Sequence, residues 1–173
     1  MEKLPKINII YEDNHLLVVE KPVNIPVQED ISQDIDMITL LKKYRIKKEN
    51  KKGDAYIGLV HRLDRPVGGI MVFAKTSKAA SRLSEEIRNN NFHKTYIAVI
   101  QGTMPKEGKL EDYLIKDNNK NISYIATKDK GKYSALEYKI LNTKNNLSLV
   151  KINLITGRSH QIDYNLLVET IPY

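Results

Sequence analysis

Apolar and polar residues alternate at every second position in several segments, which is the pattern of β-strands buried on one face. Residues 7–20 predict two short strands joined by a turn at Asp13-Asn14. Pro22 ends the second strand, because proline cannot donate to a strand ladder. Residues 95–101 predict a further alternating strand.

The second half of the chain predicts a hairpin and a polar connection. Residues 136–140 and 147–149 alternate on either side of the polar residues 142–146, which predicts an antiparallel hairpin. Residues 116–132 are rich in Asn, Gly and Lys and predict a loop or a loose hairpin.

Two apolar runs enclose a polar loop in the first half. Residues 56–60 predict a strand that enters the loop 61–69, and residues 70–74 predict a buried strand that leaves it. Loops supported by rigid strands often carry functional groups, so we expect the chemistry here.

Two segments have the period of an α-helix. The first covers residues 36–46 with Asp36 as its expected N-cap, and the second begins at the expected cap Ser77 and ends at residues 89–91. Strands outnumber helices, so the predicted class is α+β, with a mixed, largely antiparallel sheet and flanking helices. The residues expected to point inward are Ile38, Leu41 and Tyr44 in the first helix, and Ala80, Leu83 and Ile87 in the second.

The composition is that of a globular protein with excess positive charge. The chain is 41% hydrophobic and 28% charged, with a net charge of +7, and a pI near 9.4. This balance favours a polyanionic partner, nucleic acid above all. Seven basic residues lie within 42–52 and form either a solvated helix end or a contact surface for phosphate. They include Lys42, Lys43, Lys47 and Lys48.

The chain contains no cysteine, which excludes disulfides, thiolate metal sites and a cysteine nucleophile. The N-terminal residues show no apolar run of signal-peptide length, and no stretch approaches the roughly 18 apolar residues of a membrane span. We therefore expect a soluble, cytoplasmic protein that does not associate with a membrane.

The polar loop has the sequence His61-Arg62-Leu63-Asp64-Arg65-Pro66-Val67-Gly68-Gly69. Asp64 lies between two arginines, whose charges favour its ionised and nucleophilic form. The alternative is a turn in which Asp64 forms a surface ion pair. A metal site at His61 and Asp64 is disfavoured, because a spacing of three aligns them only on a helix and Pro66 opposes one.

Three other segments share a specific order and spacing with this loop. They are residues 10–19 followed by Lys21-Pro22, the strand Lys94-Thr95-Tyr96-Ile97-Ala98-Val99 with Gly102, and the late motif Thr156-Gly157-Arg158-Ser159-His160-Gln161-Ile162. With Gly58-Leu59-Val60 leading into the loop, the four segments resemble the RluA-type family of RNA pseudouridine synthases and cover most of residues 7–162.

The resemblance implies isomerisation of uridine to pseudouridine in structured RNA, either ribosomal or transfer RNA. This reaction involves no redox change, so no cofactor and no metal is expected. Asp64 is implied as the nucleophile, with attack at C1′ or at C6 both open. Tyr96 is implied to stack on the uracil, although its strand position also fits a packing residue, and Arg62 is implied to fill the gap left by the flipped nucleotide.

Further RNA contacts are expected from basic side chains, and we expect the chain to be a monomer. The residues concerned are His61, Arg65, Arg158 and His160, together with Lys42, Lys43, Lys47 and Lys48.

The sequence departs from the family at Asp163, where the resemblance implies an arginine that pairs with the catalytic aspartate. A carboxylate there would repel Asp64 instead of balancing its charge. We interpret the chain as a single catalytic domain, residues 1–173, that lacks its C-terminal part and has no separate N-terminal RNA-binding domain; a frame slip near codon 163 would account for the tail. The alternative function is a non-catalytic RNA-binding remnant. An unrelated hydrolase built on Asp64 would leave the other segments unexplained.

Overall fold

The computed structural model describes residues 5–117, 122–158 and 160–167. It divides into two compact units, Met1–Asn89 and Asn90–Tyr173, which are described separately. Three parts of the predicted segments lie outside the described residues: 118–121 of the polar connection, Ser159 of the late motif, and residues 168–173 of the tail.

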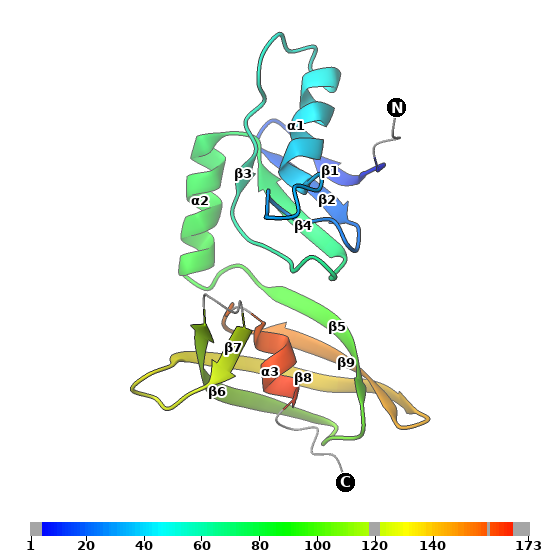
Figure 1. Ribbon diagram of the computed structural model, residues 1–173, viewed down its shortest axis with the longest axis vertical. Helices are drawn as coiled ribbons and strands as arrows, with labels where there is room; N and C mark the ends of the chain where they lie inside the picture. Colours follow the sequence, from blue (N-terminus) through cyan, green and yellow to red (C-terminus); the bar gives the residue numbers. More distant parts are fainter. Residues whose placement is uncertain (1–4, 118–121, 159, 168–173) are drawn as a thin grey trace. The chain divides into compact units, whose positions relative to one another are not determined.

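The first unit is a four-stranded antiparallel sheet of order β1-β2-β4-β3 with two helices (Figure 1). Its elements are β1 (Asn8–Glu12), β2 (Leu16–Lys21), α1 (Met37–Lys48), β3 (Gly58–Leu59), β4 (Gly69–Ala74) and α2 (Ser77–Arg88). The core forms where α1 packs against β2 and β4, and its fully buried side chains are Leu17, Val19, Met37, Leu41, Met71 and Phe73.

The predicted strands of this unit are present with two corrections. The strand expected over residues 56–60 is only Gly58–Leu59. The strand expected to be buried throughout is instead buried on one face: Met71 and Phe73 are fully buried, whereas Ile70 is 65% exposed. Its side chains alternate between the core and the opposite face, as in any strand covered on one side.

Asp36 caps α1 as predicted, and its carboxylate accepts the backbone N–H of Thr39 at 3.0 Å. The helix continues to Lys48, beyond the predicted end. Its buried residues also differ from the predicted face, because Met37, Leu40 and Arg45 are buried whereas Ile38 and Tyr44 are only partly so.

The N-cap of α2 is Thr76, not the predicted Ser77. Thr76 has extended backbone angles, and its hydroxyl accepts the N–H of Ala79 at 3.1 Å, whereas Ser77 is the first helical residue. We expect Thr76→Ala to lower the free energy of unfolding by about 1 kcal/mol, and Ser77→Ala by less than about 0.5 kcal/mol. Urea denaturation of both variants measures the difference, and equal costs would contradict the assignment.

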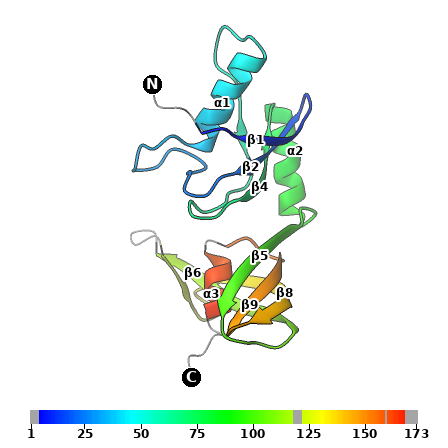
Figure 2. The same cartoon turned by 90° about the vertical axis from the view of Figure 1, so that its right-hand side faces the viewer.

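The second unit is a five-stranded antiparallel sheet of order β5-β9-β8-β6-β7, against which one short helix lies (Figure 2). Its elements are β5 (Lys94–Gln101), β6 (Glu107–Asp117), β7 (Ile122–Ile125), β8 (Lys132–Lys144), β9 (Leu147–Leu154) and α3 (Gln161–Leu167). Leu136, Val150 and Ile152 form its core together with Leu166 of α3.

The hairpin predicted around residues 142–146 is the pair β8–β9. It turns at Asn145 and Asn146, whose φ angles of 51° and 57° lie in the left-handed region that asparagine tolerates. The pair β6–β7 is the loose hairpin expected in the polar connection. The first part of β6 and the helix α3 have no counterpart in the sequence-based expectations.

The class is α+β, as predicted, and every strand pair among the described residues is antiparallel. No helix in the part of the chain that the structure describes is long and apolar enough to span a membrane.

Candidate active site

The predicted catalytic loop connects β3 to β4 in the first unit. Leu63 packs against the hydrophobic core, whereas its neighbours Arg62 and Asp64 are exposed. The N–H of Val67 donates to the carbonyl oxygen of Asp64 at 3.0 Å and closes a turn directly after the aspartate. The loop is therefore anchored on Leu63 and presents the polar residues on either side to solvent.

His61 ties the start of the loop to β4. Its Nε2 accepts the backbone N–H of Val72 at 3.1 Å, so in this arrangement the proton of the neutral ring lies on Nδ1. β3 pairs with β4 only at Gly58 and Leu59. The imidazole thus continues the ladder by one hydrogen bond beyond the end of the strand, and its role in binding RNA stays a prediction.

Lys21 holds the loop through hydrogen bonds to backbone carbonyl oxygens. Its side chain is fully buried, and its Nζ donates to the carbonyl oxygens of Pro22 at 2.9 Å and Arg65 at 3.1 Å. The Arg65 carbonyl also accepts the N–H of Asn24 at 2.8 Å. Burial lowers the pKa of Lys21, the Asp64 carboxylate raises it, and Arg65 lowers it further. The buried Lys21 therefore interacts electrostatically with the predicted nucleophile.

Sequence reasoning missed Lys21, because lysine is seldom fully buried and Lys21-Pro22 serves equally well as the end of a strand. The available signal is the position itself, since Lys21 belongs to the first of the four family segments.

If Asp64 is the nucleophile that the resemblance implies, we expect Lys21→Met to lower the turnover number of its reaction by about tenfold or more, because the backbone carbonyl of Arg65 loses a donor. The free energy of unfolding should change by less than about 2 kcal/mol, since an apolar side chain also relieves the desolvation of a buried charge. Turnover number and KM measured separately, beside urea denaturation, test this. A loss of rate no larger than the loss of folded protein would contradict it.

Gly68 and Gly69 let the end of the loop lie close to β2. A Cβ on Gly68 would lie 3.2 Å from Cγ1 of Val23 and 3.4 Å from the carbonyl oxygen of Lys21. Gly69 has a φ of 150°, which disfavours any other residue. Glycine at both positions therefore has a local structural reason.

The four lysines of α1 that are predicted to contact RNA fall into two groups. Lys42 forms an ion pair with Asp54 at 2.7 Å, and Lys48 forms one with Glu12 at 2.6 Å. Lys43 and Lys47 are exposed, and within the described residues no ion pair joins either to an acid. Lys43 and Lys47 are therefore the stronger candidates for phosphate contact.

In the second unit, Tyr96 lies on the inner face of β5. Its side chain is half-buried and packs against the core of this unit. On the outer face Ile97 and Val99 are 59% and 64% exposed. Lys94 shares the inner face with Tyr96, and burial lowers the pKa of its ammonium group; sequence reasoning did not single it out.

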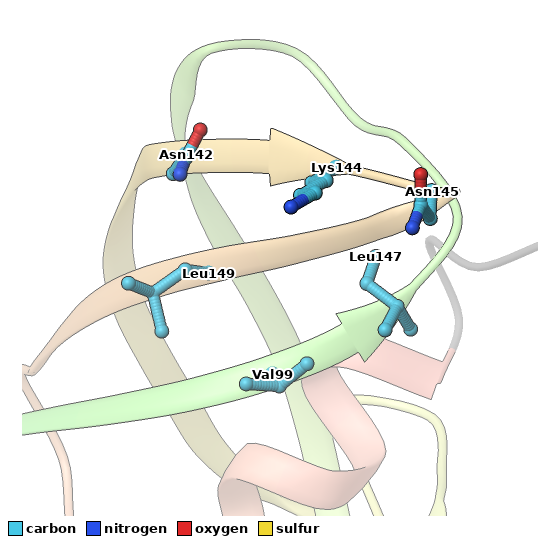
Figure 3. Close-up of a pocket in the computed structure, with 6 residues that line it drawn as sticks. All are labelled: Val99, Asn142, Lys144, Asn145, Leu147 and Leu149. Atoms are coloured by element: carbon cyan, nitrogen blue, oxygen red, sulfur yellow. The ribbon is translucent and has the colours of Figure 1, made fainter.

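The outer face carries a shallow groove of mixed character, drawn in Figure 3. Val99, Leu147 and Leu149 form its apolar side. No residue predicted for the site lines this groove, and Val99 lies on the opposite face of β5 from Tyr96.

The late motif folds around Gln161, which is buried. Its side-chain oxygen accepts from the hydroxyl of Thr156 at 2.8 Å and the N–H of Arg158 at 2.9 Å, and its amide donates to the carbonyl of Ala135 at 2.9 Å. Three satisfied hydrogen bonds thus give the spacing of the motif a structural reason.

Arg158 and His160 are positioned by this motif. The Nε of Arg158 donates to the carbonyl of Tyr133 at 2.8 Å. His160 has a φ of 52°, and its Nδ1 lies 3.7 Å from the carboxylate of Asp163. The acid that replaces the implied arginine is thus placed beside a histidine of the same motif.

A sequence model of the family described as RNA pseudouridylate synthase matches residues 15–163. The chain belongs to this family. The resemblance of the four segments is thereby confirmed, and the match to the RNA pseudouridylate synthase family ends at residue 163, where the sequence departs from the expected motif.

Two curated pseudouridine synthases illustrate the similarity. The ribosomal large subunit pseudouridine synthase C of Buchnera aphidicola is 33% identical over 166 residues, covering 95% of this chain and 51% of the relative. The ribosomal large subunit pseudouridine synthase D of Borreliella burgdorferi is 30% identical over 170 residues, covering 96% and 52%. The chain spans about half the length of these relatives.

The fold is also that of a pseudouridylate synthase. The solved structure of human RNA pseudouridylate synthase domain containing 4 aligns with a TM-score of 0.79 at 22% identity, covering 93% of this chain and 64% of that one.

Proposed function

We propose that this chain isomerises uridine to pseudouridine in RNA, with Asp64 as the nucleophile. One observation carries the proposal: in a chain of this family, the loop that bears Asp64 is fixed to its own unit by Leu63, His61 and the buried Lys21, while Asp64 itself is exposed. A preorganised, accessible carboxylate is what attack on a flipped nucleotide requires.

The atoms balance without a co-reactant. The N1–C1′ bond of uridine breaks, the base turns, C5 bonds to C1′, and the proton on C5 is lost while N1 gains one. Asp64 forms and releases the covalent bond, Tyr96 contacts the uracil ring, and Arg62 occupies the space of the extruded base. Ribosomal RNA is the proposed substrate, because two similar proteins carry the ribosomal large subunit in their names.

The test uses the proton lost from C5. Ribosomal RNA transcribed with uridine tritiated at C5 should release label into water when incubated with the chain, and the product nucleosides should contain pseudouridine in equal amount. RNA that is bound by the chain but releases no label under these conditions would overturn the proposed activity.

Asp163 favours a second candidate, in which the chain binds RNA without turnover. The resemblance implies an arginine at this position, and here an acid lies beside His160. If this candidate is correct, Asp163→Arg should raise label release above that of the unchanged chain while RNA affinity changes less. Release by the unchanged chain at an ordinary enzymatic rate would exclude it.

A further inference from the structure

Arg65, the residue after the proposed nucleophile, is held by a short turn of residues 30–34 in the same unit. Its Nη1 donates to the hydroxyl oxygen of Ser32 at 3.0 Å and lies 4.0 Å from the Asp30 carboxylate. Its Nη2 pairs with the carboxylate of Asp34. Oxygens from three side chains thus surround one guanidinium group.

The turn is built to present these oxygens. The Asp30 carboxylate accepts from the N–H of Ser32 at 2.9 Å and from its hydroxyl at 2.5 Å, and the Ser32 hydroxyl accepts the N–H of Asp34 at 3.2 Å. The hydrogen bonds from Ser32 lower the pKa of Asp30, and the bond from Arg65 lowers the pKa of Asp34. Both acids are therefore ionised at neutral pH.

The side chain of Arg65 can change partner without disturbing the loop. The side chains of Arg65 and Asp34 are 41% and 53% exposed, and ion pairs so exposed contribute little to stability and are readily exchanged. The backbone of Arg65, in contrast, is fixed through its carbonyl oxygen by Lys21 and Asn24. The guanidinium group can therefore move while the backbone that carries it stays in place.

We infer that the turn of residues 30–34 occupies the place of an RNA phosphate on Arg65, and that RNA binding exchanges one for the other. The inference rests on the proposed function, since it needs RNA at the Asp64 loop. A guanidinium fork donates hydrogen bonds to phosphate oxygens as readily as to carboxylate oxygens. RNA must displace the acids to gain this contact, so the turn weakens the binding of RNA that places a phosphate at Arg65.

The exchange predicts that removing one acidic charge from the turn tightens RNA binding. Asp34→Asn should tighten binding of a fluorescently labelled RNA hairpin by about three- to tenfold, because Arg65 no longer has to leave a carboxylate. The dependence of log K on log salt should become steeper by about one ion. In the unchanged chain the displaced Asp34 carboxylate takes up a cation, which offsets the counterion released from the phosphate, whereas an amide at this position takes up none. Glu29→Gln is the matched control, because it removes the same charge beside the turn, whereas the ion pairs of Arg65 within the described residues are with Asp30 and Asp34.

A double-mutant cycle with Arg65→Ala tests whether the tightening by Asp34→Asn depends on Arg65. In the Arg65→Ala background, Asp34→Asn should change the hairpin affinity by less than about twofold, as Glu29→Gln does in both backgrounds. Tightening that persists without Arg65, or that Glu29→Gln reproduces, would overturn the exchange. Absence of hairpin binding by the unchanged chain would overturn it together with the proposed function. If the cycle gives the expected affinities but the chain releases no label from tritiated RNA, the proposed activity is overturned and the exchange is not.

Discussion

Asparagine in place of Asp64 is expected to reduce pseudouridine formation by at least about 10³-fold, the scale on which loss of a covalent nucleophile acts. The amide matches the carboxylate in size but lacks the charge that attacks C1′ or C6. Because Asp64 is exposed, this variant should bind RNA and unfold in urea much as the unchanged chain does. Initial rates of label release from RNA tritiated at C5 of uridine measure the effect.

Asp54→Asn is the matched control for this experiment. Asp54 is an exposed acid of the same unit, and it forms an ion pair with Lys42 on α1. Its substitution should leave the rate within about twofold, since it lies outside the loop of residues 61–69. If Asp64→Asn retained more than about a tenth of the rate, Asp64 would not be the nucleophile.

The features that the sequence could predict are those that depend on near neighbours. Asp36 caps a helix through a residue three positions along the chain, and Asn145-Asn146 turns a hairpin by its own backbone preference. The loop between two apolar runs is equally local. The choice between Thr76 and Ser77 as cap was not decidable in this way, because both can accept the same N–H and only the packing of α2 sets the first turn.

The side chains that hold the loop of the candidate site contact it across long separations in the sequence. Lys21 reaches the carbonyl of Arg65 across 44 positions, and Arg65 reaches Asp34 across 31. Neither pairing leaves a periodic signal, because each joins the loop to a residue far away in the chain, at the end of β2 in one case and in the turn of residues 30–34 in the other. Sequence reasoning could therefore name the candidate catalytic loop, but it could not identify the side chains that hold it in place.

Methionine in place of Lys75 is expected to lower the free energy of unfolding by about 2 to 3 kcal/mol near pH 7. Lys75 is almost fully buried and donates to Glu12 at 2.7 Å and to the carbonyl of Asp13 at 2.8 Å, with Glu49 at 3.3 Å. Removing it leaves the buried carboxylate of Glu12 and the partly buried carboxylate of Glu49 with fewer partners. The cost stays below the full penalty because Glu12 keeps Lys48 and Glu49 keeps Arg45.

The same network makes the first unit sensitive to acid. Burial alone would raise the pKa of Glu12, but hydrogen bonds from Lys48, Lys75 and Tyr44 lower it to about 2. Hydrogen bonds from Arg45, opposed by burial and aided by Lys75 and Lys51, lower the pKa of Glu49 to about 2. Both carboxyl groups have a lower pKa in the folded chain than their ordinary value of 4.5, so they stabilise the fold at pH values above 4.5. This stabilisation is lost as the pH falls toward 2.

The two effects are coupled, and their coupling provides the sharper test. The free energy of unfolding of the unchanged chain should fall by on the order of 3 kcal/mol between about pH 5 and pH 2. That of Lys75→Met should fall by less, because the pKa values of its carboxyl groups lie closer to the ordinary value. The cost of the substitution should therefore shrink with falling pH. Lys42→Met, which breaks the exposed pair with Asp54, should cost less than about 1 kcal/mol at neutral pH. Urea denaturation of the three chains across this range measures these costs, and a pH-independent cost for Lys75→Met would show that lost packing, not charge, accounts for it.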